Sequence, residues 1–221
     1  MREPKTTQAK KAYRSIKEDI ITGEFPPGYP LSEVELSEKL EMSRTPVREA
    51  LHRLKTEGLV FSPRGKGLSV KTFTPLEVCQ AYEYGECLEG MAAYLIAQRL
   101  SKEDSASLAA ALFALEESVS IMEQANEEQD VNRWAEADDA FHEGLRDLCA
   151  NAFIRAALVQ VYGIVHYTRM LITKTRLDKG RSTLDHRRTL DMIKEGRADE
   201  ARAVMNGHWR RIRDEVMGII R

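Results

Sequence analysis

Nine residues in the first third of the chain decide the fold around them: Ser43-Arg44-Thr45-Pro46-Val47-Arg48-Glu49-Ala50-Leu51. Thr45-Pro46 is typical of a helix N-cap followed by the first helical residue, where the missing N–H of proline costs no hydrogen bond. The apolar residues that follow recur at helical spacing, and the pattern stops at Gly58. We therefore predict a helix with one buried face that opens at this stretch.

The sequence on both sides extends this helix into a small domain. Upstream, a helix is predicted over residues 12–22, and the capping box Ser32-Glu33-Val34-Glu35 predicts a short helix to Leu40, followed by a tight connection. Downstream, residues 59–61 and 68–70 read as short strands around a glycine-rich turn. Together these elements predict a winged helix-turn-helix over residues 1–72, with the helix-turn-helix at about 33–52 and the wing at 59–71.

The remainder of the chain has helical patterns and no strand pattern. Thr74-Pro75-Leu76-Glu77 is a second capping box, and Gly196 has the place of a helix stop. We predict six helices, over about residues 74–98, 101–125, 130–150, 152–176, 183–195 and 198–220. The predicted fold class is mainly α: an N-terminal winged helix-turn-helix and, over residues 73–221, an all-α bundle of six to seven helices.

The composition excludes several classes of protein. With 221 residues, of which 43% are hydrophobic and 31% charged, the chain is globular rather than fibrous or disordered. No apolar run approaches the roughly 18 residues of a membrane span, and the start has no apolar core for a secretory leader. Three cysteines without a CxxC pair give no disulfide framework. We expect a cytoplasmic protein with no membrane segment.

The charge is divided unevenly along the chain. Residues 1–72 carry 14 Lys and Arg against 10 Asp and Glu, whereas residues 73–221 carry 19 against 25. A basic head on an acidic body favours a polyanion as the partner of the head alone.

The start of the helix at residue 45 has the chemistry that binds DNA. Its unpaired N–H groups and positive dipole end favour a phosphate, and the hydroxyls of Ser43 and Thr45 can add hydrogen bonds. Arg44 and Arg48 are four residues apart, so they share a face from which a guanidinium can fork onto a guanine edge. Taken alone, this pair also fits a solvated helix face with ion pairs to neighbouring glutamates.

The predicted wing supplies further cationic groups. Arg64 and Lys66 lie at the tip of the hairpin with Gly65 between them, and they can meet phosphates while the glycine lets the backbone enter a narrow groove. Arg53 fits a phosphate contact and an ion pair with Glu49 or Glu57 equally well.

The head resembles the winged helix-turn-helix of the GntR family of bacterial transcription regulators. The resemblance covers nearly all of residues 1–72 and rests on four stretches: residues 20–28, 36–40, 43–51 and 57–60. It implies a homodimer on a double-stranded, palindromic DNA operator. It also implies base or phosphate contacts at Ser43, Arg44, Thr45 and Arg48, and a wing at Arg64-Gly65.

Four residues of the body suit a metal. Asp138 and His142 are four apart on one predicted helix, and therefore on one face. His186 and His208 lie on the last two helices, which a tight hairpin at Gly196 can bring together. Three imidazoles and a carboxylate suit a divalent transition metal such as zinc, nickel or manganese. On the residues alone, a surface or capping role for the Asp-His pair stays open.

The body resembles the FCD ligand-binding domain of the FadR-like subfamily. The resemblance covers roughly residues 74–220 and rests on Asp138-x-x-Phe141-His142, Asn151, His186, Glu195-Gly196-Arg197 and His208. It implies that the Asp and the three His hold a metal at the floor of an effector cavity, where an organic acid binds. In the family an arginine stands four residues before the Leu88-Glu89 glutamate, whereas this chain has Gly85.

A polar stripe offers another place for an effector. Tyr162, His166, Arg169 and Thr173 are spaced four, three and four residues apart, so they share one face of a predicted helix. In a pocket, Arg169 would fork onto a carboxylate. The stripe equally fits the solvated side of the helix.

These observations predict a transcription regulator, most simply a repressor, that responds to a small organic acid. Two alternatives remain open: a metal-dependent, hydrolase-like enzyme, because a metal held by three His and one Asp can activate water, and a constitutive DNA binder with a structural metal. No general base stands out for the enzyme, and a DNA-reading head would be unexplained, so we expect no enzymatic activity.

Overall fold

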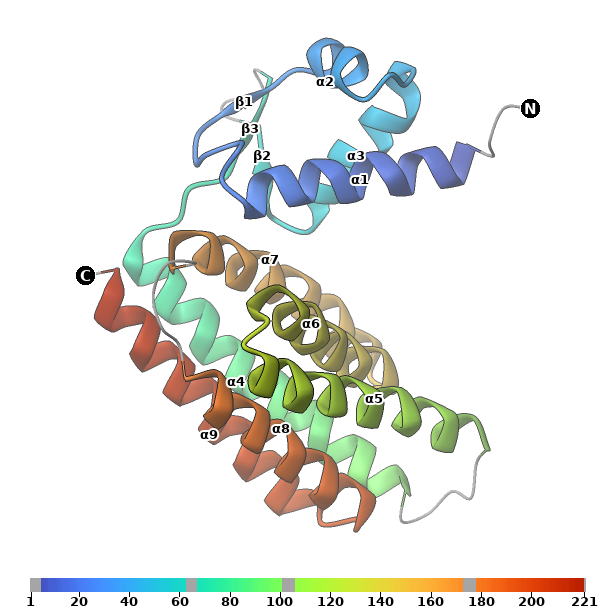
Figure 1. Cartoon of the computed structure of the whole chain (residues 1–221), viewed down its shortest axis with the longest axis vertical. Coiled ribbons are helices and arrows are strands. Elements are labelled where there is room, and N and C mark those ends of the chain that lie inside the picture. Colours follow the sequence, from blue (N-terminus) through green and yellow to red (C-terminus); the bar gives the residue numbers. More distant parts are fainter. Residues whose placement is uncertain (1–4, 63–66, 101–105, 173–177, 221) are drawn as a thin grey trace. The chain divides into compact units, whose positions relative to one another are not determined.

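The computed structural model describes residues 5–62, 67–100, 106–172 and 178–220. Within these ranges the chain has nine helices and three short strands (Figure 1). They are α1 Lys5–Ile21, β1 Pro30–Leu31, α2 Glu33–Lys39, α3 Arg44–Thr56, β2 Val60–Phe61, β3 Leu68–Val70, α4 Pro75–Leu100, α5 Ala106–Glu128, α6 Val131–Leu148, α7 Ala152–Ile172, α8 Lys179–Lys194 and α9 Ala198–Ile219. The mainly α fold class is confirmed.

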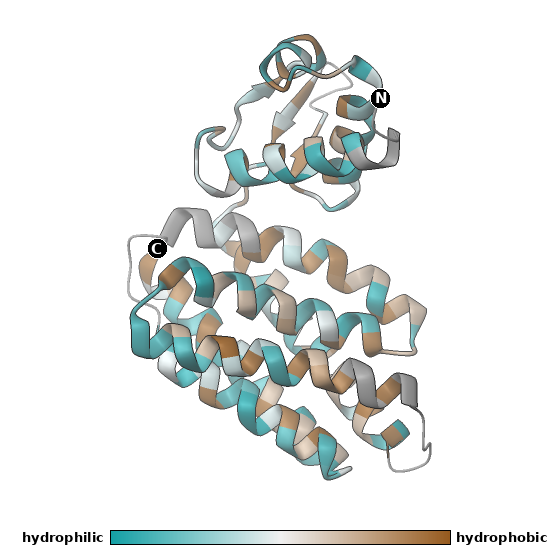
Figure 2. Ribbon diagram, turned by 45° about the vertical axis from the view of Figure 1, so that its right-hand side comes forward, coloured by the Kyte–Doolittle hydropathy of each residue, from teal (hydrophilic) through white to brown (hydrophobic). Residues whose placement is uncertain are grey.

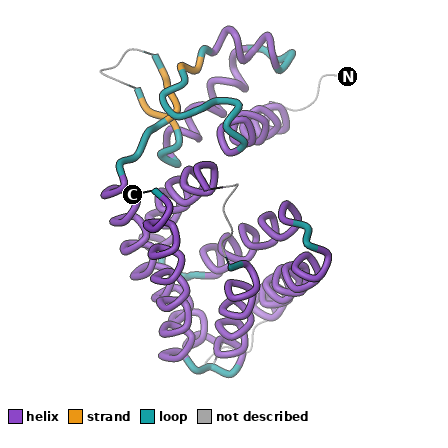
Figure 3. The backbone as a smooth tube through the Cα atoms, turned by 60° about the vertical axis from the view of Figure 1, so that its left-hand side comes forward, coloured by secondary structure: helices purple, strands orange, loops and turns teal. Residues whose placement is uncertain are grey.

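The chain divides into two compact units. The described residues within 1–78 and 159–175, with residue 220, form one, and those within 79–158 and 176–219 form the other. The helix-turn-helix and all strands of the described ranges belong to the first unit. The strands are drawn in orange in Figure 3. The elements that lie wholly in the second unit are all helices, namely α5, α6, α8 and α9.

The first unit is built on α3. This helix packs against α1 and α2, and its buried face continues the apolar pattern seen in the sequence. The sheet has the order β1-β3-β2 and is antiparallel throughout, with Leu31 opposite Leu68 and Val60 opposite Val70. The hairpin β2-β3 confirms the predicted wing strands. β1 was not predicted, because a strand of two residues has no period to detect.

The turn between α2 and α3 has an unusual residue. Glu41 has φ 52°, in the left-handed region where glycine is usual. The N–H groups of Glu41 and Met42 donate to the carbonyls of Glu38 and Ser37, which is the Schellman arrangement that ends a helix. This closure gives the tight connection that the sequence predicted.

The first residue of α3 differs from the prediction. Ser43 is the N-cap and Arg44 the first helical residue, whereas Thr45 was predicted as the N-cap. Proline fits at Pro46 because no N–H in the first turn of a helix has an intrahelical partner, so the third position serves as well as the first. The helix ends as predicted: Gly58 has φ 77°, and the N–H groups of Gly58 and Leu59 close a Schellman motif.

The six predicted body helices are present as α4 to α9. The capping box at the start of α4 is complete, since the N–H of Thr74 donates to Glu77 and the N–H of Glu77 donates to the hydroxyl of Thr74. Gly196, with φ 71°, forms the Schellman turn between α8 and α9. α8 begins one turn before the predicted Thr183, because Asp178 accepts the N–H of Arg181 and caps the helix there.

The helices of the second unit have two faces. Figure 2 shows hydrophobic and hydrophilic residues alternating along the helices, and in α6 the buried residues recur every three or four positions. α5 packs against both α6 and α8, and α8 packs against α9. The apolar side of α6 therefore faces the core. Within the described ranges, no helix is long and apolar enough to cross a membrane.

The hydroxyl of Thr183 joins three of these helices. It accepts the amide N–H of Asn126 from α5 at 2.8 Å and the indole N–H of Trp134 from α6 at 2.9 Å, and it donates to the carbonyl of Lys179. A hydroxyl offers one donor and two acceptor sites, so all of its capacity is used.

Replacing Thr183 by valine keeps the size of the side chain and removes the acceptor from the two buried donors. We expect Thr183→Val to lower the free energy of unfolding by about 1–3 kcal/mol, the usual cost of a buried polar group without a partner. Urea unfolding followed by circular dichroism measures this cost. Thr183→Ser retains the hydroxyl and should lose less; equal losses for the two variants would contradict the role of the hydroxyl.

Candidate metal centre and candidate DNA interface

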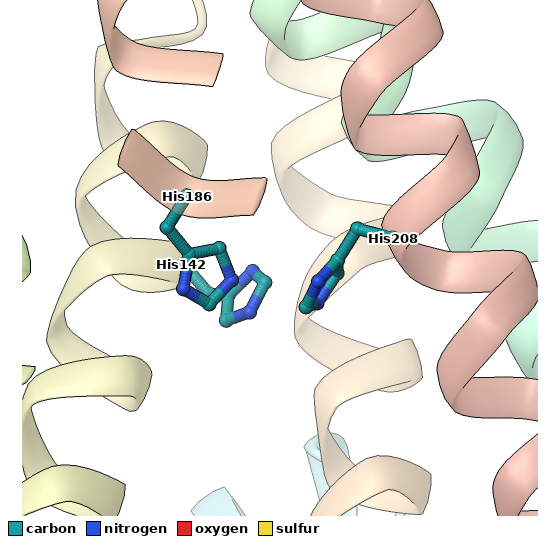
Figure 4. Close-up of side chains that lie close together, drawn as sticks. All are labelled: His142, His186 and His208. Carbon is teal, nitrogen blue, oxygen red and sulfur yellow. The ribbon is translucent and has the colours of Figure 1, made fainter. Parts of the chain in front are cut away.

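Three imidazole rings meet inside the second unit. They belong to His142 of α6, His186 of α8 and His208 of α9, and Figure 4 shows them turned toward one another. One nitrogen of each lies within 4.8 Å of one nitrogen of each of the others. Their relative exposures are 9%, 0% and 5%, so the cluster is screened from water.

Local sequence patterns explain why the three rings meet. His142 shares the inward face of α6 with Phe141 and Leu145. The turn at Gly196 folds α9 back on α8, which brings the rings of His186 and His208 to a centroid distance of 4.5 Å. This is the hairpin geometry that the sequence predicted.

Asp138 lies at the edge of the cluster. Its Oδ1 is 3.8 Å from Nε2 of His142 and 3.6 Å from Nδ1 of His186, and the side chain is buried. The side chains of all four predicted metal ligands therefore lie close together, although they belong to three helices. The group in which every donor atom lies within 4.8 Å of the others comprises the three histidines alone, so Asp138 would have to move inward to share one ion with all of them.

Two carboxylates that sequence reasoning did not assign to the site lie behind the imidazoles. Glu89 of α4 is fully buried, and both of its oxygens are 2.8 Å from Nδ1 of His142. Asp185 of α8 has Oδ2 at 3.7 Å from Nδ1 of His208 and at 3.0 Å from Nη2 of Arg211. Carboxylates at the second ring nitrogen are typical of histidines that bind metals.

Burial and neighbouring charges act on the protonation of this cluster. Burial lowers the pKa of His208, which favours the neutral imidazole, the form that binds a metal. Burial alone would raise the pKa of Asp185, but hydrogen bonds from His208 and Arg211 outweigh it and lower that pKa. Asp185 is therefore held as a carboxylate.

The residues present fit a divalent metal. Around one ion with metal–nitrogen bonds of about 2.1 Å, three tetrahedral ligand atoms lie about 3.4 Å apart, so imidazole nitrogens that now lie within 4.8 Å of one another would have to approach by up to about 1.4 Å. Asp138, Glu89 and Asp185 bring three buried carboxylates, and Arg211 brings one positive charge. A cation held by the imidazoles would offset part of the negative charge of these carboxylates.

Gly85 is explained by a neighbouring indole. A Cβ atom at Gly85 would lie 2.3 Å from Cζ3 of Trp209, so no larger side chain fits while Trp209 stays in place. The family resemblance leads one to expect an arginine at this position, and the indole of Trp209 fills the space that the arginine side chain would need.

The polar stripe on α7 is described only in part. Tyr162 is buried, at 8% relative exposure. Thr173 and the side chains of His166 and Arg169 lie outside the described residues. The effector role of these four residues stays a prediction.

The start of α3 presents its polar residues to solvent. Ser43, Arg44, Thr45 and Arg48 are exposed, while the apolar side of the helix is buried. The hydroxyl of Ser43 makes no capping bond to α3. Within the residues that the structure describes, no salt bridge joins Arg44 or Arg48 to a glutamate, so the alternative of ion pairs with Glu41 or Glu49 has no support.

Arg53 has a structural role in the first unit. Its guanidinium lies over the ring of Tyr13 at 3.8 Å from the centroid, and its Nε is 2.9 Å from a carboxylate oxygen of Glu57. The hydroxyl of Tyr13 donates to the same carboxylate. Arg53 thus ties α3 to α1. The wing residues Arg64, Gly65 and Lys66 lie outside the described residues, so their role stays a prediction.

Known protein families match both the N-terminal and the C-terminal part of the chain. Residues 8–70 match the family of bacterial regulatory proteins, gntR family, and residues 80–211 match the FCD domain. An HTH-type transcriptional regulator from the TAR-I ttuE-ttuC' intergenic region of Agrobacterium vitis is 40% identical over 134 residues, which is 61% of this chain and 76% of that protein.

Two further matches cover almost the whole chain. A probable D-xylose utilization operon transcriptional repressor of Paenarthrobacter nicotinovorans is 26% identical, over 92% of this chain and 86% of that protein. A crystal structure of a GntR regulator from Rhodococcus sp. RHA1 shares the fold, with a TM-score of 0.75 at 20% identity over 97% of this chain and 100% of that one. The FCD match alone spans more than half of the chain, and the chain therefore belongs to the GntR family of bacterial regulatory proteins with an FCD domain: it is a DNA-binding transcriptional regulator and not an enzyme.

Proposed function

We propose that this chain is a metabolite-responsive repressor that holds a divalent transition metal and a small carboxylate effector in its body. In this proposal residues 1–72 bind a palindromic operator as a homodimer in the cytoplasm, and residues 73–221 sense the effector. The observation that carries the proposal is the convergence of three buried imidazoles in a chain whose α3 start is exposed and cationic.

The DNA half of the proposal rests on the exposed start of α3. GntR regulators bind DNA operators and effectors, commonly as dimers. We assign base or phosphate contacts to Ser43, Arg44, Thr45 and Arg48, because their side chains are exposed and the arginines have the geometry to fork onto guanine. The wing at Arg64, Gly65 and Lys66 would add phosphate contacts.

The sensing half of the proposal rests on the metal. FCD domains in this family can bind metals. His142, His186, His208 and Asp138 would hold zinc, nickel or manganese, leaving coordination positions for a carboxylate of the effector. Arg169 is the proposed second anchor for that carboxylate. The effector must bind more tightly to one arrangement of the DNA-binding heads than to another. A ligand with equal affinity for both arrangements would not change their relative populations.

Repression relieved by the effector is the favoured direction of control. The relative from Paenarthrobacter nicotinovorans is described as a repressor, and so is the Escherichia coli regulator RspR, which is 28% identical over 136 residues. A small organic acid bound in the body would then release the operator.

A thermal-shift screen of small organic acids tests the proposal. We expect one class of carboxylates to raise the melting temperature of the metal-loaded protein, because a ligand at one hundred times its Kd stabilises by about 2.7 kcal/mol. The same acid should lose its effect after a chelator removes the metal, and it should release operator DNA in fluorescence anisotropy. An acid that stabilises equally with and without metal would contradict the proposed coordination.

A constitutive DNA binder with a structural metal is the second candidate. The low exposure of the three imidazoles favours it, since a closed site with all positions filled by protein is typical of structural zinc. In that case the chelator would lower the melting temperature, and no acid in the screen would change operator affinity.

A further inference from the structure

Glu89 is a buried charge at a place that favours an apolar residue. It lies on the inward face of α4 with Ala93 and Ile96, and its relative exposure is 0%. Both carboxylate oxygens are 2.8 Å from Nδ1 of His142, and one of them accepts the indole N–H of Trp209. A buried carboxylate is costly unless it is hydrogen-bonded, so these contacts stabilise it.

The contact with Glu89 decides which nitrogen of His142 carries the proton. A neutral imidazole has one N–H and one lone pair, and a carboxylate oxygen can only accept. With Glu89 ionised and His142 neutral, this contact places the proton on Nδ1, beside Glu89, and the lone pair on Nε2. The Nε2 atom is the one that lies 3.8 Å from Oδ1 of Asp138, another proposed ligand.

Trp209 and Gly85 hold Glu89 in place. The indole of Trp209 fills the space beside Gly85, where a Cβ would lie 2.3 Å from the ring, and from there its N–H reaches Glu89. Trp209 is the residue after His208, so α9 carries one proposed ligand and also supports the residue that orients another.

We propose that Glu89 is the positioning residue of the metal centre: it fixes His142 as the Nδ1–H tautomer, with Nε2 ready to bind the ion, and Trp209 and Gly85 keep it there. The inference rests on the proposed metal site. It adds residues of α4 and α9 that touch no ion themselves and act only through His142.

The affinity for Zn²⁺ alone, measured by competition with a chromogenic chelator, gives the first test. Glu89→Gln should weaken binding 10–100-fold, as is usual when a residue that orients a metal ligand is replaced. Glu86→Gln is the matched control, because Glu86 is also a carboxylate of α4 paired with α9, through Arg210, but does not touch a histidine. Equal affinities of the two variants would overturn the proposal.

The tautomer of His142 in the metal-free protein gives the second test and needs no metal. Long-range ¹H–¹⁵N spectra at alkaline pH should show a protonated Nδ1 in the wild type, and Glu89→Leu should lose this preference while the circular dichroism spectrum is retained. A protonated Nε2 in the wild type would overturn the proposal. If the wild type binds no Zn²⁺, the proposed function fails at the metal, while the spectra still decide the role of Glu89.

Discussion

Replacing His186 and His208 together by alanine is expected to abolish stoichiometric metal binding. The two rings supply two of the four proposed ligands and lie on the two helices of one hairpin, so the remaining pair on α6 could hold an ion only weakly. Complete zinc sites contribute about 10–16 kcal/mol of binding free energy in small domains. Losing half of the ligands should therefore reduce the affinity by several orders of magnitude, and elemental analysis after dialysis should find no bound transition metal.

His52→Ala is the control for this experiment. His52 lies on α3 with its side chain exposed, so its loss removes an imidazole without touching the cluster. The double variant should keep its helical circular dichroism spectrum, and a chelator should no longer change its melting temperature. In the wild type and in His52→Ala, removal of the metal should lower the melting temperature. A double variant that still carries one metal per chain would rule out this site. If the alanines unfold the protein, the polar pair His186→Asn with His208→Asn retains more of the packing and allows the same measurement.

The sequence predicted the helices well because their signals are local. Each of these signals depends on only a few neighbours in the chain: the capping boxes at Ser32 and Thr74, the glycines at positions 58 and 196, and the spacing of apolar residues. The differences are also local: β1 is too short to show a period, α3 begins at Arg44 although the hydroxyl of Ser43 makes no capping bond, and Asp178 caps α8 one turn before the predicted start.

The four proposed metal ligands could also be found from the sequence, but the residues behind them could not. Asp138 and His142 are related by one turn of a helix, and His186 and His208 by one hairpin. Glu89, by contrast, meets His142 across 53 residues and Trp209 across 120. Such contacts depend on how the helices are rotated against one another, which no spacing rule gives. The signal that could have drawn attention to Glu89 is the place of a carboxylate among the buried apolar residues of α4.

Arg48→Ala is expected to weaken binding to the cognate DNA site about 5–150-fold. Arg48 is exposed on the first turns of α3, and a guanidinium that forks onto O6 and N7 of guanine contributes about 1–3 kcal/mol of discrimination. A DNA duplex selected from a random library by the wild-type protein serves as the probe, and fluorescence anisotropy at fixed salt gives the affinity. Binding to an unrelated duplex should change much less, because that binding depends on phosphate contacts.

Arg53→Ala separates a DNA contact from a loss of stability. Both arginines belong to α3, but Arg53 stacks on Tyr13 and pairs with Glu57, so its loss should lower the melting temperature and leave the sequence preference unchanged. Arg48→Ala should do the reverse. Arg48→Lys tests the forked geometry, since an ammonium keeps the charge but cannot form the two parallel hydrogen bonds. If lysine restores full discrimination, Arg48 contacts a phosphate rather than a base; if alanine leaves the preferred sequence and its affinity unchanged, the exposed start of α3 does not read DNA through this residue.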